Sequence, residues 1–222
     1  MAEAAATDAP RLGLRERKKQ RTRELIAEAA RRLFAKRGFD RVTIAEVARA
    51  AEVSEQTVFN YFPTKEDLVY WRLETFEDEL LAAIRERGPG ESVLQAFGSF
   101  VLQRRGLLAE RDPKARERLA ELTRMITESP ALLAREREIF ERYTASLAKV
   151  IAEETSASAA DVQPWVVANA LIGVHRALVD HTRRRIVAGA PSARIQREVR
   201  VQGERVLATL EHGLGSLGVR TR

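Results

Sequence analysis

Residues 43–65 read TIAEVARAAEVSEQTVFNYFPTK, and this stretch decides the fold around it. Thr43 is placed to cap a first short helix, because Glu46 stands three residues later, where its side chain can reach back. Ser54 is placed to cap a second helix through its hydroxyl group. Pro63 disfavours helical geometry at the residue before it, so the second helix is predicted to end after about two turns. The stretch therefore predicts two short helices joined by a tight turn.

The second short helix combines a small apolar face with an outward face of hydrogen-bonding groups. Val53, Val58 and Phe62 are expected to face a core. The outward side chains are short or planar, namely Glu55, Gln56, Thr57, Asn60 and Tyr61. Gln and Asn can bond an adenine edge, Glu can accept from cytosine, and a Thr methyl can touch a thymine methyl. A helix-turn-helix presents such a helix to the major groove, although a plain helical hairpin with a solvated face fits the pattern too.

A longer segment carries a family resemblance. Residues 21–68, RTRELIAEAARRLFAKRGFDRVTIAEVARAAEVSEQTVFNYFPTKEDL, resemble the N-terminal domain of the TetR/AcrR family of bacterial repressors. The matching motifs occur in the family's order, at residues 37–39, 43–44, 53–54, 57–59 and 61–66. Two positions depart from the family pattern. Gln56 stands where a small residue is common, and Phe59 stands where a tyrosine is common, so Phe59 has no hydroxyl group for a phosphate.

The resemblance and the residue types together predict which side chains contact DNA. Base edges are expected to be read by Gln56, Thr57 and Asn60, with Glu55 as a further candidate. Thr43, Tyr61 and Lys65 are expected to hold phosphates, and Ser54 belongs to the same DNA-contacting set. The implied function is a DNA-binding transcriptional regulator, a repressor released by a small ligand, that binds a palindromic operator as a homodimer.

The distribution of charge agrees with a nucleic-acid partner. The chain has 222 residues, no Cys and a formal net charge of +6. Residues 1–65 hold 14 Lys/Arg and 9 Asp/Glu, so almost all of the excess positive charge lies there, where phosphate contacts need it. A basic membrane-binding helix is the rival interpretation, but the basic residues 11–23 have few apolar neighbours. No apolar run has the length of a membrane span and no secretory signal begins the chain, so we expect a cytoplasmic protein.

Helical periodicity without any convincing strand alternation predicts an all-α fold of about nine helices. We expect a disordered, basic-ended arm at 1–16, a helix-turn-helix domain at 17–65 and an effector-binding and dimerisation domain at 66–222. One long helix is expected to start at residue 65, and residues 165–179 look buried on more than one side. The last helix is expected to help form the dimer through a stripe of apolar residues, with Gly203 allowing close approach; the stripe is Ile195, Val199, Val206 and Leu210.

The resemblance also implies an apolar effector pocket among the C-terminal helices. Candidate lining residues are aromatic or sulfur-containing, with two polar contacts: Phe97, Phe100, Met125, Phe140, Tyr143, Asn169 and His175. Each apolar one of these is equally suited to an ordinary core. Residues 122–148 resemble, more loosely, a subgroup whose effectors are similar to acyl-CoA thioesters.

Other constellations predict no site. Residues 213–218 match G-x-G-x-x-G, but a dinucleotide site needs a preceding strand, and here a helix precedes. His175 and His181 do not share a helix face as a metal-binding pair would. We therefore expect no metal, no cofactor and no enzymatic activity, since no catalytic constellation stands out. A helical adaptor without sequence-specific DNA binding is the alternative function, and an α-helical enzyme is a weaker third.

Overall fold

The computed structural model describes residues 13–71, 73–103 and 113–213. These ranges hold ten α-helices and no strand, which confirms the predicted all-α class. The chain divides into two compact units, residues 1–71 and 72–222. Residues 1–12 of the predicted arm and residues 214–218 of the glycine-rich tail lie outside the described ranges, whereas α1 already begins at Leu14.

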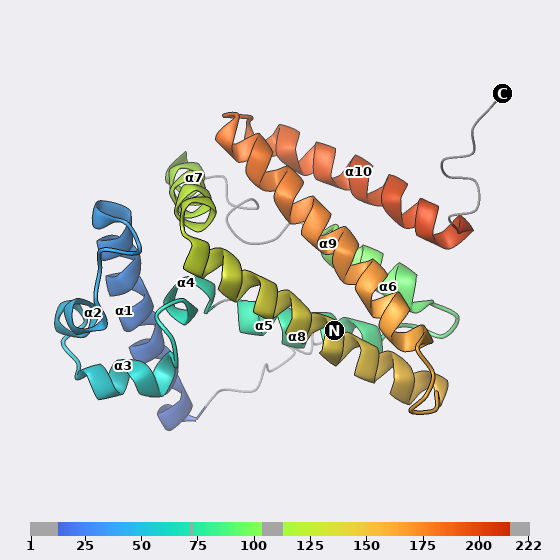
Figure 1. Cartoon of the computed structure of the whole chain (residues 1–222), viewed down its shortest axis with the longest axis horizontal. Helices are drawn as coiled ribbons and strands as arrows, with labels where there is room; N and C mark the ends of the chain where they lie inside the picture. The colour runs from blue at the N-terminus through green and yellow to red at the C-terminus, as the bar shows by residue number, and fades with distance from the viewer. Residues whose placement is uncertain (1–12, 72, 104–112, 214–222) are drawn as a thin grey trace, which may run out of the picture. The chain divides into compact units, whose positions relative to one another are not determined.

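The first unit contains four helices, coloured blue to cyan in Figure 1. They are α1 (Leu14–Arg37), α2 (Ile44–Ala50), α3 (Glu55–Tyr61) and α4 (Asp67–Tyr70). Both α2 and α4 pack against α1, and α2 packs against α3. The core is made of fully or almost fully buried side chains: Ile26, Ala30, Phe34, Val42, Val47, Val58, Phe62 and Leu68. This apolar core holds the two short helices at residues 43–62 in place. Helices of seven residues would not be stable in isolation.

The helix predicted to run on from residue 65 is interrupted. Thr64 and Asp67 cap each other's backbone N–H groups, as Thr64 N donates to Asp67 at 2.9 Å and Asp67 N donates to Thr64 Oγ1 at 3.3 Å. This cap lies just before α4, which lasts only four residues, and α5 (Leu73–Arg85) is a separate helix. Continuous apolar periodicity concealed this break, because the pattern records which face is buried and not whether the backbone continues.

The second unit is built from longer helices. After α5 come α6 (Val93–Val101), α7 (Pro113–Glu128), α8 (Pro130–Thr155), α9 (Gln163–Val187) and α10 (Ser192–His212). In Figure 1, α8 and α10 both lie along α9. Ser129 caps the start of α8, and Pro130 occupies the first turn, where no amide donor is needed. A largely buried ion pair joins α8 to α9, in which Arg183 donates to both carboxylate oxygens of Glu136.

The stripe expected on the last helix is turned partly inward. Ile195 is 2% exposed and packs with Ile186 and Ala190, with Val199 against the same cluster. Gly203 is also buried, and a Cβ atom there would stand 2.3 Å from Cδ2 of Leu102 in the same chain. The predicted dimer contacts of Ile195 and Gly203 are therefore wrong, because both are buried inside their own subunit, whereas those of half-buried Val199 and Leu210 and of exposed Val206 stay predictions.

Helix α9 is more exposed at its start than the sequence suggested. Trp165 and Val166 are 51% and 62% exposed, and Val162 just before the helix is 70% exposed. Asp161 accepts a hydrogen bond from Gln163 N at 2.9 Å and helps to start the helix. This end of the helix therefore presents an apolar face that its own chain does not cover, and the expected burial on a second side stays a prediction that depends on a partner subunit. No helix in the described ranges is long and apolar enough to cross a membrane.

Candidate nucleic-acid interface

Helix α3 is held at both ends by local interactions. Ser54 Oγ accepts a hydrogen bond from Thr57 N at 3.0 Å, and the two hydroxyl oxygens of these residues are 2.8 Å apart. At the other end, Phe62 N donates to Val58 O at 2.8 Å before Pro63 prevents continuation. Val58 and Phe62 are both 0% exposed, so they anchor the inner face of α3 in the core. The hydroxyl groups of Ser54 and Thr57 thus have structural partners as well as their predicted DNA-contacting role.

The outer face of α3 carries the side chains predicted to read bases. Glu55, Gln56 and Asn60 are exposed, whereas Thr57 and Tyr61 are half-buried. Gln56 Nε2 donates to Asn60 Oδ1 at 3.0 Å, which joins the two amides into one pair. Because residues four apart lie on the same helix face, the pair presents its remaining donors and acceptors together.

Helix α2 begins with a reciprocal cap that includes a predicted phosphate-binding residue. Thr43 Oγ1 accepts from Glu46 N at 3.3 Å, while Thr43 N donates to Glu46 Oε2 at 2.9 Å. Arg37 Nη1, at the end of α1, donates to Glu46 Oε1 at 2.6 Å. The backbone N–H of Thr43, followed by the guanidinium of Arg37, lowers the pKa of Glu46 to about 2. The sequence indicated the cap, but it gave no signal for the contact with Arg37, nine residues away.

Lys65, the last predicted phosphate contact, has an aromatic neighbour. Its Nζ atom lies 4.2 Å from the ring centroid of Phe39, a cation–π geometry. Phe39 is itself 4% exposed and lies edge-to-face against Phe34. The ring of Phe39 therefore orients the ammonium group of Lys65, and a charge held in this way is suited to a phosphate oxygen.

The basic run predicted as a possible arm is helical in the structure. Helix α1 includes residues 15–23, and five cationic side chains there are exposed: Arg15, Arg17, Lys18, Lys19 and Arg21. Gln20 and Glu24 bond one turn apart on the same helix at 2.9 Å. The run is a positively charged helix start, which can attract a phosphate backbone without any sequence preference.

The second unit brings together several of the predicted effector-binding residues. Phe76 lies at their centre, with ring centroids of Phe100 at 5.3 Å, Tyr143 at 5.7 Å and His175 at 4.7 Å. Phe140 completes the cluster at 6.1 Å from Tyr143 and 5.7 Å from His175. We call these five residues the ring cluster. The sequence placed Phe76 among the aromatic residues suited to a core or a pocket lining, but helical spacing alone could not mark it as the centre of the cluster.

His175 is the titratable member of the ring cluster. Its ring stacks on Phe76 with an interplanar angle of 19°. Burial among aromatic rings lowers the pKa of His175 to about 4, because the charged imidazolium loses its hydration there. At neutral pH the imidazole is therefore uncharged and keeps one donor and one acceptor nitrogen.

The remaining predicted effector residues are distributed differently. Phe97 is 0% exposed and Met125 is half-buried. Asn169 is exposed on α9, where its Nδ2 donates to Trp165 O at 2.8 Å. The structure does not bring Asn169 together with the ring cluster, since it stands on the uncovered face of its helix.

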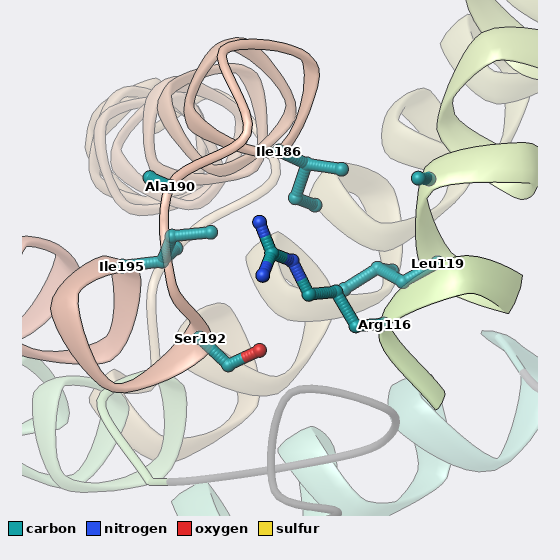
Figure 2. Close-up of a pocket in the computed structure, with 7 residues that line it drawn as sticks. Arg116, Leu119, Ile186, Ala190, Ser192 and Ile195 are labelled. Carbon is teal, nitrogen blue, oxygen red and sulfur yellow. The ribbon is translucent and has the colours of Figure 1, made fainter. Parts of the chain in front are cut away.

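A small cavity lies elsewhere in the second unit, where α7 meets the turn between α9 and α10. Figure 2 shows Arg116 extending toward this turn, with its guanidinium group near Ile186, Ile195 and Ser192. Arg116 donates to Gly189 O, which ties α7 to the turn. The cavity of about 20 Å³ has room for roughly one water molecule. It is too small for an effector, and it contains none of the predicted effector residues. Within the described ranges no three His, Cys, Asp or Glu residues are grouped to hold a metal ion.

Models of known protein families match residues in both units of the chain. The family model for bacterial regulatory proteins of the tetR family matches residues 26–70, and the MftR C-terminal domain matches residues 91–188. The transcriptional regulator TcmR of Streptomyces glaucescens is 29% identical, over 68% of this chain and 70% of TcmR. The transcriptional regulator MftR of Mycobacterium tuberculosis is 26% identical, over 76% of this chain and 83% of MftR.

A solved structure supports the fold. The crystal structure of NalD, the secondary repressor of the MexAB-OprM multidrug efflux pump in Pseudomonas aeruginosa, aligns with a TM-score of 0.51. The alignment covers 86% of this chain and 97% of NalD at 18% identity, so the likeness concerns the fold alone. Relatives that are named transcriptional regulators favour DNA binding over the adaptor and enzyme alternatives. With a helix-turn-helix unit that matches the family model and relatives that are regulators, the chain is a DNA-binding transcriptional regulator that belongs to the TetR family.

Proposed function

We propose that this regulator is a ligand-released repressor that binds a palindromic operator as a homodimer in the cytoplasm. The observation that carries the proposal is the amide pair on α3, in which Gln56 Nε2 donates to exposed Asn60 at 3.0 Å. Amide side chains can bond an adenine edge through its N6 and N7 atoms. Glu55 and Thr57 extend this face, while Ser54 fixes the start of the helix.

Phosphate contacts are proposed for three further residues. Thr43, which caps the first turn of α2, is proposed to lie against one phosphate group, and Tyr61 is proposed to donate from its phenolic hydroxyl group to another. Lys65 adds a point charge oriented by the ring of Phe39. Such contacts fix the register of the protein on the duplex and carry no sequence information themselves.

A homodimer is supported by the uncovered apolar face at the start of α9. Val162, Trp165 and Val166 are each more than half exposed, which is unfavourable for apolar side chains of this size unless a partner covers them. A two-fold interface would pair this face with its own copy. Two recognition helices one helical turn apart are what a palindromic operator requires.

Effector binding is proposed at the ring cluster. Its rings suit an apolar ligand, and neutral His175 offers a hydrogen bond. Phe97 and Met125 are further candidates for the lining. The looser resemblance to regulators with acyl-CoA-like effectors makes acyl thioesters the first compounds to test. An effector releases the operator only if it binds the DNA-free state more tightly than the DNA-bound state.

A selection from random DNA duplexes tests the proposal. The expected product is a two-fold symmetric site with half-sites one helical turn, about 34–36 Å, apart. The double variant Gln56→Ala/Asn60→Ala serves as the control and is expected to enrich this site poorly while still binding duplexes at low salt. Selection of no sequence by the parent would contradict the proposal, and an asymmetric site would contradict its dimeric part.

A further inference from the structure

Phe59 is a large apolar side chain in the middle of an otherwise polar surface. It is 45% exposed on α3, three residues after Gln56 and adjacent to Asn60. Among the described residues its ring has no aromatic or cationic partner. The core of the first unit does not use it, because Val58 and Phe62 already occupy the inner face of the helix at 0% exposure.

The position of Phe59 follows from helical geometry. Successive residues are rotated by about 100° around a helix axis, so the residue after buried Val58 points away from the core. Residues three and four apart are neighbours, which puts Phe59 beside Gln56 and Glu55 on the outer face. Phe59 therefore shares the surface of the side chains proposed to read bases, and this inference rests on that proposed function.

The chemistry of a phenyl ring restricts what it can recognise. It has no donor for a phosphate oxygen and no charge, so it cannot add to the backbone contacts in the way Lys65 does. In the major groove the apolar group among the base edges is the C5-methyl of thymine, and Phe is one of the side chains that contact it. We propose that Phe59 reads a thymine methyl group, next to the base pair contacted by the amide pair of Gln56 and Asn60.

Removal of individual thymine methyl groups from the operator tests this assignment. The symmetric site obtained by selection is remade with deoxyuridine in place of each thymidine, one symmetric pair of positions at a time, which removes only the methyl group. For one such pair the parent is expected to lose about fourfold in affinity per half-site, the equivalent of one buried methyl group. Phe59→Ala is expected to bind the parental site more weakly and to show no further loss with deoxyuridine at that pair.

Two further variants test whether the loss of affinity with deoxyuridine depends on the ring of Phe59. Phe59→Leu keeps an apolar contact and is expected to retain part of the deoxyuridine effect. Gln56→Ala leaves Phe59 in place and is expected to retain all of it. Because Phe59 is exposed, neither Phe59 variant should lower the unfolding temperature much, and circular dichroism checks this.

The outcomes distinguish the inference from the function on which it rests. If the parent prefers a symmetric site but no deoxyuridine pair weakens it, the assignment is overturned while the proposed function stands. The assignment is also overturned if Phe59→Ala shows the full deoxyuridine effect. It is overturned as well if Phe59→Ala weakens binding to all duplexes alike, because that result would place the ring against the sugar–phosphate backbone. If the parent prefers no sequence at all, the proposed function itself fails at the selection step.

Discussion

Arg37 and Glu46 join the end of α1 to the first turn of α2, with guanidinium Nη1 and carboxylate Oε1 2.6 Å apart. The other guanidinium nitrogen, Nη2, donates to Arg41 O at 3.0 Å in the connection between the helices. The second oxygen of Glu46 accepts from both the backbone and the hydroxyl group of Thr43. The Arg37–Glu46 pair thus links the long first helix, the inter-helix turn and the capping residue proposed to hold a phosphate.

Removing the charge of Glu46 is expected to weaken the first unit and to change its response to acid. The pKa of Glu46 is lowered from 4.5 to about 2, so its ionised form stabilises the fold above pH 4.5, and this contribution disappears as pH falls toward 2. Glu46→Gln should lower the free energy of unfolding at pH 7 and flatten its acid dependence between these values. Urea titrations at several pH values measure both.

Thr43→Ala should show a related loss of about 1 kcal/mol, which is typical for a missing N-terminal cap. Glu16→Gln, at an exposed pair with Lys19 in α1, is the matched control. It removes a carboxylate but leaves the contacts of Glu46 with Arg37 and Thr43 unchanged. Equal acid dependence in Glu46→Gln and the parent would contradict the role assigned to Glu46.

The amide pair on α3 should behave as one unit in DNA recognition. Gln56→Ala and Asn60→Ala are each expected to cost about 1–3 kcal/mol on the selected operator and to relax the preference at one position. Since Gln56 donates to Asn60, the double variant should lose less than the sum of the two single losses. Binding titrations on the selected site and on a scrambled duplex provide the double-mutant cycle. Strict additivity would show that the two amides act independently.

Lys65 should affect all DNA sequences alike. Lys65→Ala is expected to reduce the slope of log affinity against log salt by about 1, without changing the preferred site. Lys65→Arg keeps both the charge and the contact with Phe39, so it should retain the slope. Affinities measured from low to moderate salt test this, and an unchanged slope in Lys65→Ala would remove this residue from the phosphate contacts.

Acidification should destabilise the second unit through His175. The pKa of this side chain is lowered from 6.5 to about 4, so the unfolded chain takes up the proton first. The stability that depends on neutral His175 is complete above pH 6.5 and is lost as pH falls toward 4, with a total of roughly 3 kcal/mol. His175→Phe should remove this dependence. Thermal unfolding of the parent and of His175→Phe between pH 7 and 4 tests it.

The oligomeric state should respond to α9 and not to the inner residues of α10. Trp165→Glu combined with Val166→Glu is expected to give folded monomers with weakened operator binding, because the charges would be buried in the dimer contact. Ala145→Glu, at an exposed position of α8, is the control for added charge. Val199→Glu should instead lower the unfolding temperature, since Val199 packs against the chain's own cluster. Sedimentation of the parent as a monomer at micromolar concentration would contradict the dimer.

Local chemistry explains which parts of the fold could be predicted from the sequence. Ser54, Thr43 and Pro63 act on backbone groups within a few residues, so the bounds of α2 and α3 follow from rules about neighbours in sequence. The same holds for Ser129 and Pro130 at the start of α8. The prediction of about nine helices agrees with the ten in the described ranges, although nothing in the apolar pattern separates α4 from α5.

Tertiary packing explains what the sequence left undetermined. Ile195 and Val199 look like a surface stripe in sequence, but the neighbouring turn at Ala190 covers them. Phe76 became the centre of the ring cluster only through residues 24 to 99 positions away along the chain. The contact of Arg37 with Glu46 likewise depends on how α1 and α2 pack. Periodicity identifies a buried face, but it cannot identify which other segment buries it.

The shortness of α3 limits how much information the helix can read. Its seven residues extend over about 10 Å, the length of roughly three base pairs. Two copies of α3 would then inspect about six base pairs, which distinguish only about 4,000 sequences, against roughly a million or more competing sites in a genome. Such a helix pair alone would find hundreds of matches. Additional specificity can come from DNA whose stiffness and groove shape between the half-sites suit the protein, at base pairs that no side chain touches.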